Sequence, residues 1–344
     1  MALGMDETEE PFETETPLAE AMQQHLDALA KPQGSLGRLE EFATKLAVIQ
    51  GRVPPVVERK TAVVCAADHG VVQEGVSSLP VGATVEMVRN FADGKAAVSI
   101  LSQACDFEVR LVDCGLRETV SSPRVQELRA GPGTANFRNK PAMSHEQLFR
   151  CVENGRDLAG EIGGAGITPG ADIVALGELG VGNTTTAAAV ALALGAPEEV
   201  LAGGDRVSGE LMERRQAVIR DALKRHKPFS NPYDVLRKVG GFEFATLVGI
   251  ILGLRHRGIA CVLDGFPATV AAYAAAVIDP HVTDFLFAGH RSNTRGHDVL
   301  LRALELDPIL DLDMHVGEAG GAVLAGFQLD LAARLANGLA RRKW

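Results

Sequence analysis

The sequence predicts an α/β fold: a doubly wound, mostly parallel Rossmann-like sheet with a small helical domain built from both chain ends. Three observations lead to this prediction. Short apolar runs recur along the chain, each followed by polar or glycine-containing residues and then by a helical pattern. Both ends of the chain show helical patterns without such runs. A chain of 344 residues, 46% of them hydrophobic, is also long enough to bury one large core.

Five apolar runs are the expected buried strands. They span residues 61–66, 109–114, 171–176, 259–263 and 284–288. Their alternation with helical patterns favours right-handed crossovers between parallel strands. The carboxyl ends of all five strands should therefore meet at one edge of the sheet.

Helical patterns fill residues 18–52, with an interruption at residues 31–37, and the last 25 residues. Thr84 is the expected N-cap of a helix over residues 85–104, and residues 243–254 should form an apolar helix inside the fold. Residues 126–141 are rich in Gly, Pro and Asn and predict a long loop, either functional or disordered.

These patterns divide the chain into four expected segments. They are an acidic, disordered tail over residues 1–17, the N-terminal helices of the small domain over residues 18–58, a Rossmann-like catalytic domain over residues 59–318, and a C-terminal helix over residues 319–344 that returns to the small domain.

The net charge of −10 is concentrated at the start of the chain. Residues 1–20 hold seven acidic side chains and no basic one, so the remaining chain has 37 acidic against 34 basic side chains. This balance gives no support to nucleic-acid binding. The acidic start is also the wrong charge for a signal peptide, and no apolar stretch is long enough to span a bilayer.

The five cysteines are scattered and odd in number, without Cys-x-x-Cys spacing. Such a pattern favours reduced thiols in the core of a cytoplasmic protein over a disulfide framework or a zinc site. The nine histidines lie in unrelated local contexts, which also argues against a metal site. The sequence has no Gly-x-Ser-x-Gly motif, so covalent hydrolase chemistry is disfavoured.

Polar residues follow each predicted strand. The five ends are Asp68-His69-Gly70, Asp113, Gly177-Glu178, Asp264-Gly-Phe-Pro267 and Gly289-His-Arg-Ser292. Open α/β sheets bind ligands at this edge. His69 is expected as a hydrogen-bonded wall of the cleft, and His290 to Ser292, with His297, suit either a phosphate or a solvated turn.

The segment Leu176-Gly-Glu-Leu-Gly-Val-Gly-Asn-Thr-Thr-Thr186 reads as strand, turn and helix start. A helix start after such a turn favours a bound anion, although a plain connecting turn is an equal alternative. It is not a dinucleotide-binding loop, because Thr185 stands where a third glycine is needed, and it lacks the Gly-Lys-Ser/Thr of nucleotide triphosphate loops.

Two glutamates share a glycine-rich setting before an apolar helix. Glu178 and Glu318 each stand among glycines, which suggests either acid–base work in an apolar cleft or simple helix capping.

Taken together, these motifs resemble one family, the nicotinate-nucleotide:5,6-dimethylbenzimidazole phosphoribosyltransferases, the CobT enzymes of cobalamin lower-ligand assembly. The resemblance runs through most of the chain in family order. Its motifs are Lys31-Pro-Gln-Gly-Ser-Leu-Gly-Arg-Leu-Glu40, Ala67-Asp-His-Gly-Val71, Val85-Glu-Met-Val-Arg-Asn-Phe91, Gly133-Thr-Ala-Asn-Phe137 with Pro141-Ala-Met143, Gly177-Glu-Leu-Gly-Val-Gly-Asn-Thr-Thr185, Asp264-Gly-Phe266, Gly289-His-Arg-Ser292 and Val316-Gly-Glu-Ala-Gly-Gly321.

The resemblance implies transfer of phosphoribose from nicotinate mononucleotide to dimethylbenzimidazole, giving α-ribazole 5′-phosphate and nicotinate. It also implies a homodimer without a metal or organic cofactor. Glu318 would be the general base and Glu178 a supporting group. Phosphate and ribose contacts would come from Gly180, Gly182, Asn183, Thr184, Ser292, Gly317 and Arg215, and acceptor-base contacts from Ser78, Pro80, Glu86, Leu179, Asp68 and His69.

Three departures from the family pattern stand out. Glu86 replaces a common glutamine, which opens the choice of acceptor base. Ala319-Gly320 replaces Gly-Thr or Gly-Ser after the expected base, and Arg215 replaces a common lysine. Transfer to another acceptor, such as a phenol or purine, and a non-catalytic nucleotide sensor stay open as alternatives.

Overall fold

The computed structural model describes residues 15–164, 170–202 and 209–343. Within these ranges one six-stranded sheet forms, with strand order β3-β2-β1-β4-β5-β6 and every neighbouring pair parallel. This is the order of doubly wound dinucleotide-type folds, which reverses direction between β1 and β4. The strands are β1 Lys60–Ala67, β2 Glu108–Gly115, β3 Val125–Glu127, β4 Ile173–Leu179, β5 Ala260–Leu263 and β6 Leu286–Ala288.

The predicted strands are confirmed with three differences. The three-residue strand β3 lies at the start of the expected loop and was missed. Strand β6 begins only at Leu286, because residues 280–285 form a 3-10 helix. Strand β4 runs on to Leu179, so Gly177 and Glu178 lie inside a strand and not in a turn.

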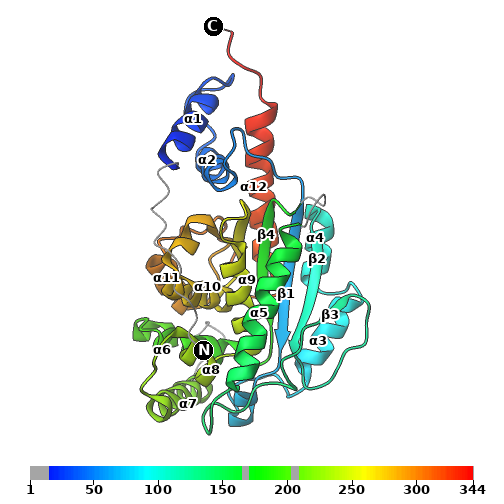
Figure 1. The fold of residues 1–344 in the computed structure, drawn as a ribbon, viewed down its shortest axis with the longest axis vertical. Helices are drawn as coiled ribbons and strands as arrows, with labels where there is room; N and C mark the ends of the chain where they lie inside the picture. Colours follow the sequence, from blue (N-terminus) through cyan, green and yellow to red (C-terminus); the bar gives the residue numbers. More distant parts are fainter. Residues whose placement is uncertain (1–14, 165–169, 203–208, 344) are drawn as a thin grey trace.

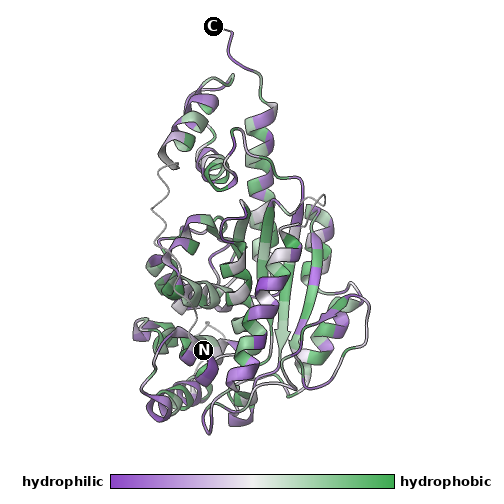
Figure 2. Ribbon diagram, viewed as in Figure 1, coloured by the Kyte–Doolittle hydropathy of each residue, from purple (hydrophilic) through white to green (hydrophobic). Residues whose placement is uncertain are grey.

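Strands β1, β4, β5 and β6 are buried along their whole length, whereas β3 and the start of β2 are partly exposed. The sheet has a helical layer on either side (Figure 1). Figure 2 shows the apolar colouring of the central strands between these layers. On one face α5 His145–Ile162 and α9 Phe242–Leu254 pack on each other, with α6 Asn183–Ala193 and α10 Phe266–Ile278 beside them. Residues 243–254 are therefore helical as predicted.

The other face carries α12 Gly320–Gly338, α2 Arg38–Gln50 and the pair α3 Ala83–Ala92 and α4 Ala97–Cys105. The remaining elements are α1 Glu15–Asp27, α7 Glu210–His226, α8 Pro232–Val239, α11 Arg295–Ala303, and the 3-10 helices η1 Gly70–Glu74, η2 Glu198–Leu201 and η3 Pro280–Phe285. No helix in the described ranges is long and apolar enough to cross a membrane.

The prediction of one helix over residues 85–104, capped by Thr84, is wrong. Gly94, at φ 75°, separates α3 from α4, and Gly82 occupies the N-cap position of α3. Thr84 lies inside α3, where its hydroxyl accepts the N–H of Val181 at 3.1 Å. The hydroxyl therefore anchors the turn after β4 and does not cap its own helix.

The segment expected as a long loop contains no helix or strand after β3 ends at Glu127, yet it is packed. The Phe137 side chain is almost fully buried, and the N–H of Thr134 donates to the carbonyl oxygen of Asp68 at 2.9 Å. The loop therefore belongs to the core at the end of β1.

Both chain ends contribute helices to one end of the molecule, where α1, α2 and α12 lie together (Figure 1). Helix α1 begins at Glu15, and the expected disordered tail otherwise lies outside the described residues. Helix α12 extends further and also packs on α4, β4 and β5.

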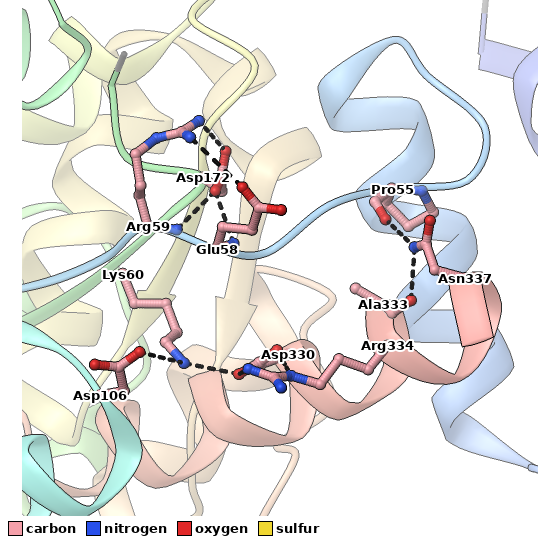
Figure 3. A network of polar contacts seen from close by, with 10 residues as sticks. All are labelled: Pro55, Glu58, Arg59, Lys60, Asp106, Asp172, Asp330, Ala333, Arg334 and Asn337. Atoms are coloured by element: carbon pink, nitrogen blue, oxygen red, sulfur yellow. Dashed lines mark hydrogen bonds and ion pairs between the residues drawn. The ribbon is translucent and has the colours of Figure 1, made fainter. Parts of the chain in front are cut away.

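A buried ion pair fastens α12 to the first strand (Figure 3). The Lys60 ammonium lies 2.7 Å from the carboxylate of Asp330, and both side chains are at most 1% exposed. Arg334 contacts the same carboxylate, and the ring of Phe107 lies under the ammonium. Burial disfavours the charged form of Asp330, but the hydrogen bonds from Arg334 and Lys60 outweigh it and lower the pKa of this carboxyl group.

Candidate active site

A cavity of about 260 Å³ opens at the carboxyl ends of β4, β5 and β6. This is the sheet edge that the polar strand ends predicted, beside the point where the strand order reverses. The lining residues are 77–79, Met87, 178–184, Arg215, 264–267, His290, Ser292, Thr294 and 315–317. Segments far apart in the sequence thus converge on one pocket.

The turn after β4 needs its glycines for close packing. A Cβ on Gly180 would lie 2.4 Å from the carbonyl oxygen of Ala67, and Gly182 has φ 93° with its own Cβ position 2.8 Å from Val72. Helix α6 starts directly behind Gly182, so the positive end of its dipole points toward the cavity. The two glycines therefore let the turn pack closely against the end of β1 and the start of η1, with the α6 helix start at the cavity.

Asn183 joins this helix start to the first glutamate. Its Nδ2 donates to the carboxyl group of Glu178, while its Oδ1 accepts from the N–H of Thr184 at 2.7 Å. A bound anion would therefore have to compete with Asn183 for the Thr184 N–H. Arg215 of α7 supplies a positive charge to the same wall, and its Nε donates to the carbonyl oxygen of Val76 at 2.6 Å.

Glu178 faces the cavity from the end of β4 and is only 4% exposed. Burial, above all, raises the pKa of this carboxyl group to about 8, with further contributions from the nearby acids Glu243, Asp264 and Glu318. The hydrogen bond from Asn183 opposes the shift without cancelling it. At neutral pH Glu178 is therefore mostly a neutral acid that can donate a hydrogen bond.

Glu318 directly follows the cavity-lining Gly317 and is half-buried. Its neighbour Gly317 lines the cavity, whereas the Glu318 carboxylate accepts the backbone N–H of Val98 at the start of α4. The second oxygen, Oε2, is buried without a hydrogen-bond partner among the described residues. Burial and the charge of Asp264 raise the pKa of Glu318, and the bond from Val98 opposes this.

The backbone around Glu318 is strained. Gly317, Glu318 and Ala319 have φ angles of 77°, 64° and 67°, in the left-handed region that residues with a side chain rarely adopt. Consecutive strained residues of this kind cluster at functional sites.

The ends of β5 and β6 carry a hydrogen-bonded acid, two histidines and a serine. Asp264, after β5, accepts the N–H groups of Gly321 and Ala322 at 2.8 and 3.1 Å, so it caps α12. His290, after β6, lies 3.5 Å from the same carboxylate. The Ser292 hydroxyl contacts Nδ1 of the fully buried His297 at 2.9 Å.

Comparison with known proteins identifies this arrangement. The sequence profile of a family described as phosphoribosyltransferase matches residues 13–343. The chain belongs to this phosphoribosyltransferase family. A nicotinate-nucleotide–dimethylbenzimidazole phosphoribosyltransferase of Thermus thermophilus is 45% identical over 314 residues, covering 90% of this chain and 92% of that protein. An enzyme of the same name from Chloroflexus aggregans is 42% identical over 313 residues, covering 89% of this chain and 87% of that protein.

A solved structure supports the same conclusion at the level of the fold. The crystal structure of CobT from Thermus thermophilus superposes with a TM-score of 0.88 at 42% sequence identity, covering 94% of this chain and 97% of that one. The α/β architecture expected from the sequence is therefore that of the phosphoribosyltransferase family.

Most residues that the resemblance placed in the phosphoribosyltransferase site line the cavity. They are Glu178, Leu179, Gly180, Gly182, Asn183, Thr184, Arg215, Ser292, Gly317 and Ser78. The cavity also includes Asp264, His290, Met87 and Thr294, which the site prediction omitted. The strand-end positions of Asp264 and His290 were the sequence signal that could have included them.

Five predicted site residues do not line the cavity. Besides Glu318 they are Pro80 and Glu86, which are exposed, and Asp68 and His69, which are buried beneath it. Glu86 lies on the outer side of α3, and the next residue, Met87, faces the cavity instead.

His69 is held from two sides in the core. Its Nε2 lies 2.9 Å from the Glu243 carboxylate and its Nδ1 3.0 Å from the hydroxyl of Thr186. Asp68 accepts the N–H of Arg117 at 2.9 Å. His69 lies against Gly180 of the turn, Asp68 holds the Arg117 backbone, and neither lines the cavity.

Proposed function

We propose that this protein transfers the phosphoribosyl group of nicotinate mononucleotide to 5,6-dimethylbenzimidazole. The products are α-ribazole 5′-phosphate, a precursor of the cobalamin lower ligand, and nicotinate. The observation that carries the proposal is a family match over nearly the whole chain, combined with a cavity at the strand-order reversal that pairs a glycine-rich turn and helix start with a buried carboxyl group.

The reaction needs a base that removes one proton, and its leaving group needs no metal. Nicotinate leaves from a pyridinium ring without protonation, whereas the benzimidazole must lose its N–H proton as its other nitrogen attacks the anomeric carbon. We assign this proton to Glu318. Its carboxylate form is stabilised by the Val98 N–H, and its Oε2 is free of other hydrogen bonds in the described part of the chain.

Glu178 has a different role in this proposal. A carboxyl group with a pKa of about 8 holds its proton at neutral pH, so it donates a hydrogen bond to the bound ribose. A neutral Glu178 also avoids placing another negative charge beside the substrate phosphate. The pair thus divides into a donor, Glu178, and an acceptor, Glu318.

The substrate phosphate belongs at the α6 wall. Arg215 is the only Lys or Arg side chain among the described residues that line the cavity, and the α6 dipole reinforces its charge. Attack from the face opposite the departing nicotinate inverts the β configuration to α. Holding both substrates in this geometry supplies much of the remaining barrier reduction.

An apolar end of the cavity suits the acceptor ring. The cavity lining includes the apolar side chains of Leu79, Met87, Leu179 and Val316 and the hydroxyls of Ser77 and Ser78, and we place the acceptor ring against them. A planar, weakly polar benzimidazole matches this lining better than a purine, whose several ring nitrogens would lose their hydrogen bonds to water.

Acceptor preference can be decided by competition. Purified protein is offered nicotinate mononucleotide with equimolar dimethylbenzimidazole, unsubstituted benzimidazole, adenine and a phenol, and the products are counted. Dimethylbenzimidazole should dominate. Because Glu86 is exposed outside the lining, Glu86→Gln should leave the product ratio within about twofold, whereas Met87→Ala should change it more.

We further propose that the protein acts in the cytoplasm as a homodimer. All five cysteines are buried as free thiols, which supports a reducing compartment. Leu79, Val81, Leu312 and Val316 are 44% to 58% exposed, and two of them line the cavity, so a partner subunit would cover apolar surface at its mouth. Light scattering on the purified protein reports its oligomeric state.

A variant assay tests the proposed function. Wild-type protein should release nicotinate from nicotinate mononucleotide only when dimethylbenzimidazole is present. Glu318→Gln should lower turnover by roughly 10²- to 10⁴-fold, as removal of a general base does. Glu41→Gln, at an exposed acid of α2, is the matched control. Equal turnover in wild type and Glu318→Gln removes Glu318 from its role, and absence of nicotinate release from wild type contradicts the function.

A further inference from the structure

The hydroxyl group of Ser292 is held by a chain of hydrogen bonds behind the cavity wall. Both the backbone N–H and the hydroxyl of Ser292 contact Nδ1 of His297, at 3.1 and 2.9 Å. Nε2 of His297 lies 2.9 Å from the hydroxyl oxygen of Thr269, and that hydroxyl donates to the carbonyl oxygen of Gly265 at 3.0 Å.

This chain allows one proton arrangement. A backbone N–H can only donate, so Nδ1 of His297 must carry a lone pair and no hydrogen. The ring hydrogen therefore sits on Nε2 and points to the oxygen of Thr269, whose own hydrogen is already directed to Gly265. Burial, first, and the nearby His290 lower the pKa of His297 to about 3, so the ring is neutral across the working pH range.

The arrangement fixes the direction in which the Ser292 hydroxyl donates its hydrogen. Its oxygen lies 2.9 Å from a nitrogen that carries no hydrogen. If the serine hydrogen pointed elsewhere, lone pairs on both atoms would face each other at this distance, which is repulsive. The O–H therefore donates to His297, and the oxygen presents its lone pairs to the cavity that Ser292 lines.

We infer that Ser292 accepts a hydrogen bond from a ribose hydroxyl of the nucleotide and does not bind its phosphate. His297 is the positioning residue that sets the direction of the serine hydroxyl. The inference rests on the proposed function and revises the phosphate contact that the family resemblance implied for Ser292. A phosphate dianion offers only acceptor oxygens, whereas a sugar hydroxyl offers the hydrogen that the serine oxygen needs.

The charges of the cavity agree with this assignment. Asp264, His290 and Ser292 follow the neighbouring strands β5 and β6, whereas Arg215 comes from α7 and the α6 start follows β4. A phosphate would be repelled by Asp264 but attracted to Arg215. The sugar hydroxyls would then lie toward the oxygens of Asp264 and Ser292, which accept hydrogen bonds.

Substrate truncation tests the assignment without relying on turnover. Calorimetry gives the Kd of nicotinate mononucleotide, its 2′-deoxy and 3′-deoxy analogues, and nicotinate riboside, which lacks the phosphate, each without acceptor base. For wild type and Ser292→Ala, the ratio of each analogue's Kd to that of the full nucleotide is compared. Ser121→Ala, at an exposed serine outside the cavity lining, is the control.

In Ser292→Ala, the ratio for one of the two deoxy analogues should fall by about three- to tenfold, the effect of one lost neutral hydrogen bond. The ratio for nicotinate riboside should change by less than about twofold. A fall in the riboside ratio with unchanged deoxy ratios would overturn the assignment. Wild type that binds the nucleotide but does not turn it over contradicts only the proposed function, and wild type that does not bind it contradicts both.

His297 variants distinguish a role in orienting the Ser292 hydroxyl from a role in stability alone. His297→Asn can place a carboxamide oxygen near the Nδ1 position and should keep the wild-type deoxy ratios. His297→Phe removes the acceptor and should lower the same ratio that Ser292→Ala lowers. A structural role alone would lower the melting temperature of both variants without changing the ratios. If His297→Phe does not fold, Ser292→Ala decides the question.

Discussion

The backbone N–H of Glu318 donates to the backbone carbonyl oxygen of Glu178 at 3.3 Å. The two acids of the site, 140 positions apart in the chain, are therefore joined by their main chains, while their carboxyl groups point to different surroundings. Glu178 faces the cavity and Asn183, whereas Glu318 faces the start of α4. Burial raises the pKa of both carboxyl groups, and a different hydrogen bond opposes the shift in each, from Asn183 at Glu178 and from the Val98 N–H at Glu318.

Gly177 lies where β4 packs closely against the 317–319 turn. Adding one methyl group at this position should therefore have a severe effect. A Cβ on Gly177 would lie 2.2 Å from the backbone N of Ala319 and 2.7 Å from its Cβ. Gly177→Ala should therefore lower the free energy of unfolding by about 1–3 kcal/mol or more and displace Glu318, with loss of turnover. Urea unfolding and the nicotinate assay measure the two effects.

Gly160→Ala serves as the matched control. The added Cβ would meet only a guanidinium nitrogen of Arg257 at 3.7 Å, an ordinary contact, and alanine favours the α5 helix. This variant should be as stable as wild type or more so. Equal stability of the Gly177 and Gly160 variants would contradict the close approach of β4 to the 317–319 turn.

The raised pKa of Glu178 predicts a pH-dependent gain in stability for Glu178→Gln. The carboxyl pKa is about 8 in the folded protein, above its ordinary value of 4.5. Proton binding by Glu178 therefore favours the folded state fully below about pH 4.5, and this contribution is lost as the pH rises to 8. Relative to wild type, Glu178→Gln should gain up to a few kcal/mol between pH 5 and 8.

Melting temperatures of both proteins from pH 5 to 9 measure this gain, with Glu41→Gln as a control that should follow wild type. Parallel curves for wild type and Glu178→Gln would show that Glu178 is ionised in the folded protein. That result would also remove its role as a hydrogen-bond donor at neutral pH.

The ion pair between Lys60 and Asp330 predicts a large loss of stability when one partner is removed. Asp330→Asn leaves the buried Lys60 ammonium with only the exposed carboxylate of Asp106, 3.9 Å away, as its counter-charge, which should cost about 3–5 kcal/mol in urea unfolding. Because the pKa of Asp330 is lowered on folding, its contribution is present above its unfolded pKa and is lost as the pH falls through the folded value.

The double variant Lys60→Met with Asp330→Leu checks the cause. Two apolar side chains remove both charges, so this variant should recover much of the stability lost in Asp330→Asn. If the double variant is instead the least stable of the three, then packing around α12, and not an uncompensated charge, explains the loss.

Arg215 should act on the phosphate alone. Arg215→Ala should raise the KM for nicotinate mononucleotide by about 10- to 100-fold, as loss of a charged hydrogen bond does, while the KM for dimethylbenzimidazole stays within about twofold. Arg215→Lys should have a KM for nicotinate mononucleotide between those of wild type and Arg215→Ala. Arg214→Ala, the exposed neighbour outside the cavity lining, is the control. An equal loss with nicotinate riboside would place Arg215 away from the phosphate.

The recurrence of apolar runs along the chain, together with the composition, predicted much of the fold. Apolar runs located β1, β2, β4 and β5 because a strand buried on both faces is apolar throughout. Strand β3 was missed because three residues carry no periodicity, and its pairing depends on neighbours in β2. Thr84 was misplaced because its hydroxyl bonds to Val181, almost a hundred residues away, and such contacts leave no local pattern.

The sequence predicted which segments form the site, but not which way their side chains point. The polar strand ends and the family resemblance pointed to Glu178, Asn183 and Arg215, and all three line one cavity. Whether a side chain faces the cavity is set by packing: helix α3 turns Met87 inward and Glu86 outward, and the contacts with Glu243 and Thr186 hold His69 in the core.

The most direct test of the proposed function is the anomeric configuration and stoichiometry of the product. Purified protein is incubated with nicotinate mononucleotide and dimethylbenzimidazole, and the products are separated and examined by NMR. We predict one nicotinate released for each α-configured N-glycoside of dimethylbenzimidazole 5′-phosphate formed. Nicotinate release that ignores the added base and yields free ribose 5-phosphate would contradict phosphoribosyl transfer at this site, and a β-configured product would contradict attack from the face opposite the departing nicotinate.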